Sequence, residues 1–394
     1  MKPPLRIALI CQQDLGDTPH PVPAYRFWRT YFISALREAG HEVLEIPACD
    51  WASGLVAMPA EQAREWREHI WARACDWLKG EHTRQHIDCC LSYLYPQQIL
   101  PAAISTIRSL GVPCINFFCD NVREFMRVPK EFSPFDLHWV PEMKALPLYA
   151  KAGLNALPAP MPCWIPPHLR TLPDRDREES AVVFVGTRDE TRALLFAETI
   201  RLGLNPKLVG HGWKQPATTT VAPPKRSRWQ QLTGQAAFVR QHGFRALARK
   251  LAAKTHSSSM PEFDFAPYAH AVADETGYWD LLRNSAVCLG VNRYPSPRHN
   301  PAKPDTYSRL RDIEAPMAGA CYLTEWTEGL DALYDLGEEI ETYRTAAELV
   351  EKSRELCADA ARRDRLRRNG QRRALRDHSI NHTIGRIATT LGLG

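Results

Sequence analysis

Short apolar runs alternate with segments of helical periodicity along most of this chain, and that alternation limits the folds open to it. Short apolar runs are typical of buried strands, and apolar residues spaced three or four apart are typical of amphipathic helices. In the first half, the predicted strands are 5–11, 41–46, 89–94, 114–119, 137–140 and 159–164. The predicted helices between them are 25–39, 61–79 and 102–110. Strands that alternate with helices form parallel sheets covered on both faces, so the sequence predicts an α/β fold.

The segment 166–180 is rich in proline, aspartate and arginine, shows no periodicity, and is predicted to link two domains. Beyond it the alternation resumes, with predicted strands at 181–185, 208–210, 286–291 and 321–324. The predicted helices of this second half are 190–201, 278–284, 310–317, 346–361 and 364–377. With 394 residues the chain exceeds one ordinary core. We therefore expect two Rossmann-like domains, 1–165 and 181–375, that face a central cleft, and a C-terminal helix within 376–394 that crosses back to the first domain.

Composition argues against several classes of protein. The opening residues, MKPPLRIALI, are too short for the core of a signal peptide, and no apolar run approaches the ~20 residues of a membrane span. The 11 cysteines are scattered without zinc-site spacing, as in a reduced cytoplasmic protein. The net charge of +5 is mild and no recognition motif accompanies it, so we expect no nucleic acid partner. These features predict a cytoplasmic protein.

An insert at 214–261 interrupts the second domain and carries a run of positive charge. From 225 to 254 it contains eight lysine or arginine residues and no acidic residue. Its apolar residues, including Leu232, Val239 and Leu247, are spaced as in basic amphipathic helices. Two interpretations stay open: the helices lie on an anionic membrane surface, or they form a solvated arm that packs on its own domain. The first interpretation predicts peripheral contact with the inner face of the membrane through 225–254.

The segment 307–325, YSRLRDIEAPMAGACYLTE, has the features of half a nucleotide site. A polar, basic start that includes Ser308 leads into the predicted helix, whose free N–H groups and positive dipole end favour a phosphate. Glu314 lies two turns into the segment, where its carboxylate can reach the hydroxyl groups of an attached ribose. Arg311 is a candidate bidentate donor to a diphosphate, or alternatively it pairs with Glu314 itself.

Other candidate donor-binding residues follow predicted strands of the second domain, where ligands bind in such folds. They are Gly186, Thr187, Arg188, His211, Asn292, Arg293 and Lys303. A glycine at 186 allows the backbone to approach a ligand, although a tight turn also requires one. The loop 292–306 is long and rich in proline, which is typical of a functional loop but also of a plain surface loop. His211 is either a contact to the sugar or base or a structural histidine.

Acidic residues and a histidine follow predicted strands of the first domain. The loop 12–24 contains Asp14, Asp17 and His20, and Asp120 follows a later strand. An aspartate or histidine at such a position can act as a general base toward a substrate hydroxyl. Asp120 is the first candidate for this catalytic role and His20 the second. The alternatives are a helix N-cap for Asp120 and a solvated loop position for His20.

The second half of the chain resembles the group 1 glycosyltransferases, and within them the branch related to the spore-maturation protein CgeB. The resemblance rests on the order and spacing of several segments over roughly 200 residues, none of which is specific alone. The matching segments are 182–187, 278–285, 287–292, 311–316 with Gly319, 336–340 and the helix that starts near 347–349. The first half matches only loosely, at 118–121 and 134–136.

The resemblance implies the two-domain fold called GT-B, a metal-independent reaction, and a nucleotide sugar as co-substrate without a further cofactor. Glu314 matches the family glutamate that contacts the ribose of the donor. The family's second glutamate, eight positions earlier, is replaced by Thr306. Retention and inversion at the anomeric carbon therefore both stay open. An inverting transfer needs a base such as Asp120, whereas the leaving phosphate can do that work in a retaining transfer.

On this basis we expect a hexosyltransferase-type enzyme that moves a sugar from a nucleotide sugar to a glycan or lipid-linked acceptor of the cell envelope. Two alternatives use the same fold: a non-catalytic structural or binding protein of envelope or coat maturation, and a nucleotide-sugar epimerase. The residues Asp174, Arg175 and Asp176 match the spelling of a metal-binding DxD pair, but they fall in the predicted linker and we interpret them as coincidental.

Overall fold

The computed structural model divides the chain into two compact units. Unit 1 comprises Met1–Val122, Arg127–Trp164 and Arg376–Gly394, and unit 2 comprises Arg123–Met126 and Ile165–Leu375. The residues that the structure describes are 3–13, 20, 22, 24–214, 263–271 and 274–393. Except for Lys214, the predicted basic insert lies outside them.

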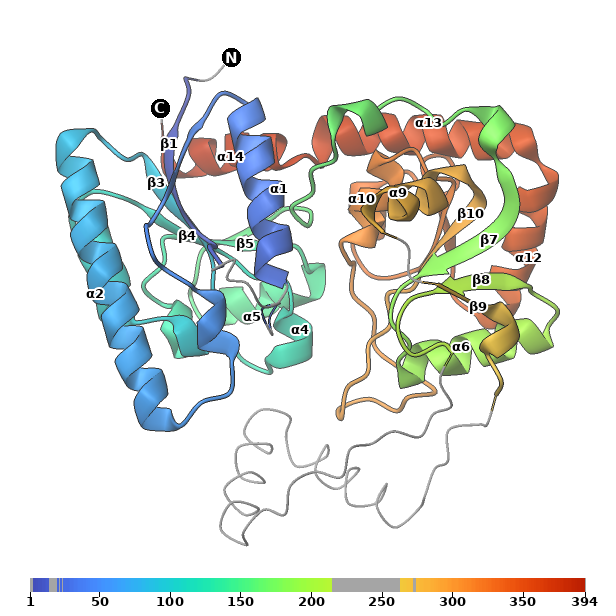
Figure 1. The fold of residues 1–394 in the computed structure, drawn as a ribbon, viewed down its shortest axis with the longest axis horizontal. Coiled ribbons are helices and arrows are strands. Elements are labelled where there is room, and N and C mark those ends of the chain that lie inside the picture. The colour runs from blue at the N-terminus through green and yellow to red at the C-terminus, as the bar shows by residue number, and fades with distance from the viewer. Residues whose placement is uncertain are drawn as a thin grey trace, which may run out of the picture. The chain divides into compact units, whose positions relative to one another are not determined.

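Unit 1 contains a six-stranded sheet in the order β2-β1-β3-β4-β5-β6 (Figure 1). The strands are β1 (Arg6–Ile10), β2 (Glu42–Glu45), β3 (Cys89–Tyr93), β4 (Cys114–Phe117), β5 (Leu137–Val140) and β6 (Ala156–Pro158). Every neighbouring pair is parallel. β2 lies on one side of β1, and β3 and the later strands lie on its other side. The strand order therefore reverses beside β1, and ligands bind at such a point in open α/β sheets.

Helices pack against the unit 1 sheet and close its core. They are α1 (Ala24–Glu38), α2 (Ala60–Arg84), α3 (Pro101–Ser109), α5 (Leu146–Lys151) and α14 (Ile380–Leu391), with the short α4 (Asn121–Glu124) after β4. Aromatic rings fill the space between α1 and the sheet: the ring centroid of Phe32 lies 6.0 Å from that of Phe117 and 5.9 Å from that of Trp139. The C-terminal α14 contacts α1 and buries Ile380, Ile384 and Ile387, which share one helix face.

Unit 2 contains a second six-stranded parallel sheet, in the order β12-β11-β10-β7-β8-β9. The strands are β7 (Glu179–Val185), β8 (Pro206–Val209), β9 (Ala269–His270), β10 (Ser285–Gly290), β11 (Tyr322–Glu325) and β12 (Glu341–Tyr343). Its helices are α6 (Glu190–Arg201), α9 (Glu275–Asn284), α10 (Arg311–Met317), α11 (Leu330–Leu333), α12 (Ala346–Ala358) and α13 (Ala360–Asp377). Counted within the unit, this is the doubly wound order 3-2-1-4-5-6, which reverses between β7 and β10.

Side-chain caps fix where several helices of unit 2 begin. Asp189 accepts a hydrogen bond from the N–H of Arg192 at 2.9 Å and so starts α6. Asp274 does the same for α9 through the N–H of Gly277 at 2.8 Å. Such caps stabilise a helix by about 1 kcal/mol each. They also set the rotation of α6 and α9, whose side chains reach the two sites described below.

Two arginines of α13 hold the chain just before β7. Arg363 and Arg367 both donate to the carboxylate of Glu178, and Arg367 also donates to the carbonyl of Ser285 at 2.7 Å. The two guanidinium groups are almost fully buried, with side-chain exposures of 9% and 5%. Removing one partner of a buried ion pair is costly, so this contact fixes the amino ends of β7 and β10.

The predicted α/β fold with two parallel sheets is confirmed, but the predicted strand at 159–164 is wrong. The strand of this region is Ala156–Pro158, and residues 159–164 have no regular secondary structure. Prolines at 160 and 162 explain the difference, because proline has no N–H to donate to a sheet ladder. The very short strands β9 and β12 were not predicted.

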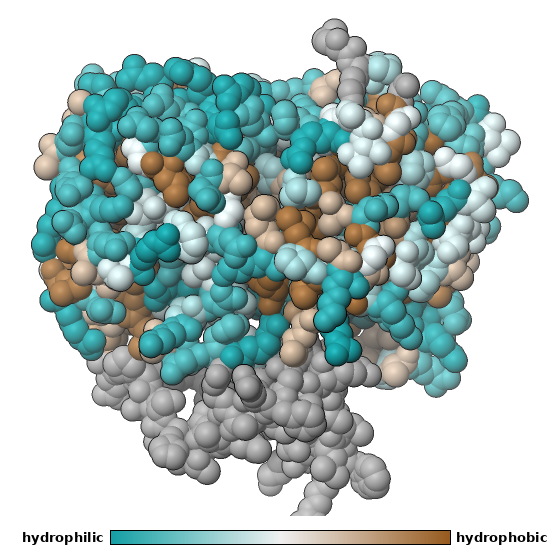
Figure 2. Space-filling model, turned by 180° about the vertical axis from the view of Figure 1, so that it is seen from behind, coloured by the Kyte–Doolittle hydropathy of each residue, from teal (hydrophilic) through white to brown (hydrophobic). Residues whose placement is uncertain are grey.

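The described surface is largely polar. Hydrophilic side chains predominate on the face shown in Figure 2. Large hydrophobic side chains that are exposed among the described residues include Val56, Met126, Leu172 and Leu202. Among the helices of the described residues, none combines the length and the hydropathy that a membrane span requires.

Candidate functional site

Two loops meet at the carboxyl edge of the unit 2 sheet, beside the point where the strand order reverses. The N–H of Gly186, just after β7, donates to the carbonyl of Val209 at 2.8 Å, and the N–H of Arg188 donates to the carbonyl of His211 at 2.9 Å. Gly210 has a φ of 142°, and a Cβ there would lie 2.3 Å from the carbonyl oxygen of Gly186. The structure thus brings together the predicted residues Gly186, Thr187, Arg188 and His211.

Three arginines gather at this edge. Arg192 of α6 donates to the carbonyl of Thr187 at 2.8 Å, and its side chain is only 15% exposed. Burial lowers the pKa of Arg192, and the positive charges of Arg309 and Arg311 lower it further. Arg309 and Arg311 therefore lie close enough to Arg192 to repel its charge, although Asp189, 3.3 Å from Arg192, opposes this effect. A cluster of like charges at a strand edge is relieved by an anion, so the arrangement favours a phosphate-containing ligand.

Arg311 is anchored to Glu314 and Tyr278. Its Nη1 lies 3.0 Å from Oε2 of Glu314, which is the i,i+3 pair that the sequence left open. The hydroxyl of Tyr278, on α9, donates to Glu314 and accepts from Arg311. Burial raises the pKa of Tyr278 well above its usual value, so the phenol stays protonated. The glutamate that the sequence predicts to contact ribose is 3% exposed and is held by a cation and a phenol.

Asp312 fastens the start of α10 to β11. Its Oδ1 accepts hydrogen bonds from Tyr322 at 2.9 Å and from Thr324 at 2.8 Å. Its Oδ2 accepts one from the N–H of Arg309 at 3.1 Å. Burial raises the pKa of Asp312, although these hydrogen bonds oppose the change. The N–H of Arg309, just before the helix, is thus bonded within the protein, and the nearby Ser308 is 6% exposed. Arginine side chains therefore supply much of the positive charge at this edge of the sheet.

The loop after β10 is held inward by Glu325, which was not predicted. Its Oε2 accepts from the N–H of Asn292 at 3.1 Å and from the N–H of Arg293 at 2.9 Å. The guanidinium of Arg293 also binds Oε1 at 2.5 Å, with a side-chain exposure of 12%. Asn292 and Arg293 therefore make contacts that shape the loop, whereas the side chain of Lys303 is exposed. An antiparallel bridge between Arg293 and Thr306 closes the loop at its base.

Sequence reasoning missed four residues of this edge: Arg192, Tyr278, Arg309 and Glu325. An arginine on a helix is usually solvated, and no local pattern distinguishes Arg192 from its neighbours. Tyr278 does lie in a segment that carries the family resemblance, and Arg309 lies in the basic segment before α10. Those two signals could have identified them.

In unit 1, Asp120 lies beside a group of tyrosines after β4. The hydroxyl of Tyr95 donates to Oδ2 of Asp120 at 3.1 Å, and Tyr93 donates to the hydroxyl of Tyr95 at 3.2 Å. The N–H groups of Asn121 and Val122 at the start of α4 donate to the carboxylate of Glu142 at 3.0 and 2.7 Å. Glu142 thus accepts from two N–H groups at the helix start.

Both ring nitrogens of His20 are engaged. Nδ1 accepts from the N–H of Val22 at 3.0 Å, so the proton lies on Nε2, which is 3.2 Å from Oδ2 of Asp50. Ser53 donates to the same oxygen of Asp50 at 2.5 Å. In this arrangement His20 has no free nitrogen for a substrate proton, which favours Asp120 over His20 as the base. Asp14 and Asp17 lie outside the described residues.

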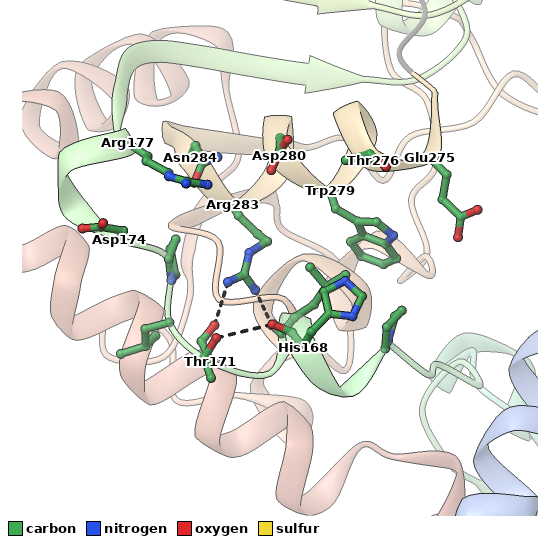
Figure 3. Close-up of a pocket in the computed structure, with 14 residues that line it drawn as sticks. His168, Thr171, Asp174, Arg177, Glu275, Thr276, Trp279, Asp280, Arg283 and Asn284 are labelled. Carbon is green, nitrogen blue, oxygen red and sulfur yellow. Dashed lines mark hydrogen bonds between the residues drawn. The ribbon is translucent and has the colours of Figure 1, made fainter.

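A cavity of about 650 Å³ lies at the opposite, amino edge of the unit 2 sheet (Figure 3). It separates α9 from the segment 166–177, which includes the 3₁₀ turns Pro167–Leu169 and Arg175–Arg177. None of the predicted donor-binding residues lines it. Asp174, within the segment, accepts from the N–H of Asp176 at 3.2 Å. No group of three metal-ligating side chains occurs among the residues that the structure describes.

Comparisons with known proteins agree with this architecture. A sequence model described as glycosyl transferase-like matches residues 192–389. No curated protein matches the chain. Among solved structures, sucrose-phosphate synthase from Thermosynechococcus elongatus is 14% identical, with 98% of this chain and 99% of that chain covered and a TM-score of 0.56. A glycosyltransferase from Rickettsia africae ESF-5 is 9% identical, with 98% and 97% covered and a TM-score of 0.55. HepE from Anabaena, in complex with UDP and glucose, is 10% identical, with 98% and 99% covered and a TM-score of 0.53. These likenesses show the GT-B fold.

Proposed function

Because this chain belongs to the glycosyl transferase-like family, we propose that it transfers a hexose from a nucleotide sugar to an acceptor hydroxyl group. The observation that carries the proposal is the cluster of Arg192, Arg309 and Arg311 at the carboxyl edge of β7. The UDP bound in HepE makes a uridine diphosphate sugar the first donor to test.

The charges of the reaction fit this cluster. When the bond between sugar and phosphate breaks, negative charge develops on the nucleoside diphosphate. Guanidinium groups placed before the reaction stabilise that charge without reorganisation, and each such donor is worth about 3 kcal/mol. We propose that arginines do this work here in place of a divalent metal. The positions of Arg309 and Arg311 near Arg192 support this, because a diphosphate would offset the repulsion that they exert on Arg192.

Glu314 would receive the ribose of the donor. Its carboxylate is shared with Tyr278 and Arg311, and Arg311 also donates to the carbonyl of Val185 at the end of β7 at 3.5 Å. An arginine that meets the diphosphate and a glutamate that meets the ribose then lie one helical turn apart. This spacing places the two halves of a nucleoside diphosphate against a single short helix.

Unit 1 would bind the acceptor, for which we propose a glycan or lipid-linked sugar of the cell envelope. Asp120 is the base in an inverting transfer, and Tyr95 orients its carboxylate through the 3.1 Å hydrogen bond. A cytoplasmic location, with peripheral membrane contact through 225–254, belongs to the same proposal and is motivated by the positive charge of that segment.

A ligand panel tests the donor site. UDP, GDP, ADP, CDP and TDP are compared by thermal shift and calorimetry. One of them should stabilise the protein, by about 2.7 kcal/mol at 100 times its Kd. Donor consumption with and without candidate acceptors then separates a transferase from a non-catalytic binder, and sugar-isomer analysis without acceptor detects an epimerase. If no nucleoside diphosphate binds, the proposal fails.

A further inference from the structure

The cavity at the amino edge of the unit 2 sheet is distinct from the donor site. Arg283 and Asn284, which line it, immediately precede β10, and the turn Arg175–Arg177 precedes β7. The arginine cluster lies beyond the other ends of the same strands. β7 has seven residues, and a strand rises about 3.3 Å per residue, so the two edges of the sheet are roughly 20 Å apart. The cavity extends along α9 from the amino edge to Thr276 and Glu275, and Tyr278 of the donor cluster lies on the same helix. The volume of about 650 Å³ is in the range of small-molecule sites.

One wall of the cavity is a polar face of α9. Thr276, Asp280, Arg283 and Asn284 recur at helical spacing and all line the cavity. Figure 3 shows Trp279 pointing from the same helix toward the segment that carries His168. An indole ring offers an apolar face and one N–H donor.

Several polar groups of the cavity are not used by the protein. Among the described residues, the side chains of Arg177, Thr276, Asp280 and Asn284 and the indole N–H of Trp279 make no hydrogen bond or ion pair. Arg283 differs, because it donates to the carbonyl groups of Leu169, Thr171 and Ala318 and so forms the floor. The cavity thus presents both unused donors and unused acceptors.

The opposite wall combines a group of apolar residues with His168, Thr171, Asp174 and Arg177. Pro166, Leu169, Leu172 and Pro173 line it, and Leu172 is 44% exposed. The charges that line the cavity nearly balance: two positive residues, Arg177 and Arg283, stand against three acidic ones, which are Asp174, Glu275 and Asp280. A strongly charged ligand would therefore be neutralised poorly. The walls fit a neutral ligand that has an apolar face and a rim of groups that both donate and accept hydrogen bonds.

We propose that this cavity is a second carbohydrate site, which binds a neutral sugar ring. The ring's C–H face lies against the prolines and Leu172 and against the accessible edge of Trp279, which is 7% exposed, and its hydroxyl groups bind Asp280, Asn284 and Arg177. Such a site would hold a sugar unit of a longer glycan away from the reaction centre. The proposal does not depend on catalysis, because binding to the cavity requires neither nucleotide nor turnover.

Saturation-transfer NMR tests the proposal directly. Glucose, galactose, mannose, N-acetylglucosamine and maltose are titrated onto the full chain, with and without excess UDP to fill the donor site. At least one neutral sugar should bind in the millimolar range, about 1 mM or weaker, and UDP should not displace it. The double variant Asp280→Ala, Asn284→Ala should weaken this binding about tenfold, because each lost hydrogen bond typically costs a fewfold in affinity.

The control is Asp331→Ala, an exposed aspartate of α11 in the same unit that lies outside the cavity. Circular dichroism and the UDP affinity should be unchanged in all variants. Three results would overturn the proposal: no neutral sugar binds, the double variant binds as well as the wild type, or glucuronate or glucosamine binds more tightly than the neutral sugars. Failure of UDP to bind would instead contradict the proposed transferase, and the sugar titration without UDP would still decide this inference.

Discussion

The two sheets carry opposite chemistry at their carboxyl edges. In unit 2 that edge gathers the guanidinium groups of Arg192, Arg309 and Arg311. In unit 1 it presents the carboxylate of Asp120 beside the phenols of Tyr93 and Tyr95. Both sheets are parallel, six-stranded and reverse their strand order once. The side chains that follow the strands, rather than the fold, therefore distinguish the two edges, and they are the basis of the proposed donor and acceptor roles.

The largest effect is expected at the unit 1 edge. Asp120→Asn keeps the shape of the side chain but removes the base, so turnover in an inverting reaction should fall by about 10²–10⁴ while UDP affinity stays the same. Steady-state kinetics and calorimetry measure the two quantities. Asp76→Asn, an exposed aspartate of α2, is the control. Full activity of Asp120→Asn would show that unit 1 supplies no base at this position.

The next effect concerns the unit 2 edge. Arg192→Gln removes one positive charge of the cluster, and turnover should fall by about 10²–10³ because charge on the leaving diphosphate loses a donor. UDP binding should weaken as well. Arg201→Gln, on the exposed face of the same helix, is the matched control. Equal behaviour of the two variants would remove Arg192 from the donor site.

A smaller effect is expected in the pH dependence of the stability of unit 1. His138 in β5 is fully buried, with its ring centroid 5.4 Å from Phe132 and 5.0 Å from Tyr149, and burial lowers its pKa from 6.5 to about 4. Between these values the unfolded state binds a proton that the folded state does not. Stability therefore falls as the pH drops through this window, by about 3 kcal/mol in total.

His138→Phe should remove this part of the acid sensitivity from unit 1. Amide hydrogen exchange in β4 and β5, compared at pH 7 and near pH 4, measures it. His86→Gln, whose parent side chain is 67% exposed, should leave the sensitivity as it is. An unchanged pH dependence in His138→Phe would rule out this origin.

The smallest effect tests the close approach of two loops. Gly210→Ala places a Cβ 2.3 Å from the carbonyl of Gly186 and requires a φ that alanine avoids, so unit 2 should lose about 2 kcal/mol of stability. UDP affinity should fall with it, because the loop after β7 shifts. Gly80→Ala in α2 meets nothing within 4 Å and should be neutral or stabilising. Urea unfolding distinguishes the two.

Sequence periodicity predicted most strands and helices because buried strands and amphipathic helices have different apolar spacing. It failed at 159–164, where an apolar composition masked two prolines that cannot donate to a sheet ladder. Of the predicted donor-binding residues, Gly186, Arg311 and Glu314 lie at one edge, and their role in binding stays a prediction. The part that could not be predicted depends on contacts between distant segments, such as Tyr278 with Glu314 and Glu325 with Arg293.

The hydrogen bonds of Arg283 couple the start of unit 2 to the end of α10. One buried guanidinium binds carbonyl groups from the backbone at Leu169 and Thr171 and, at 2.9 Å, from Ala318 at the end of α10. The N–H of Ala318 in turn donates to the carbonyl of Glu314 at 3.0 Å. If the backbone near Thr171 shifted alone, the buried guanidinium of Arg283 would lose a hydrogen-bond acceptor, and leaving that N–H unsatisfied costs free energy. Displacement at the start of unit 2 is therefore transmitted, through a single side chain, to the helix that carries Arg311.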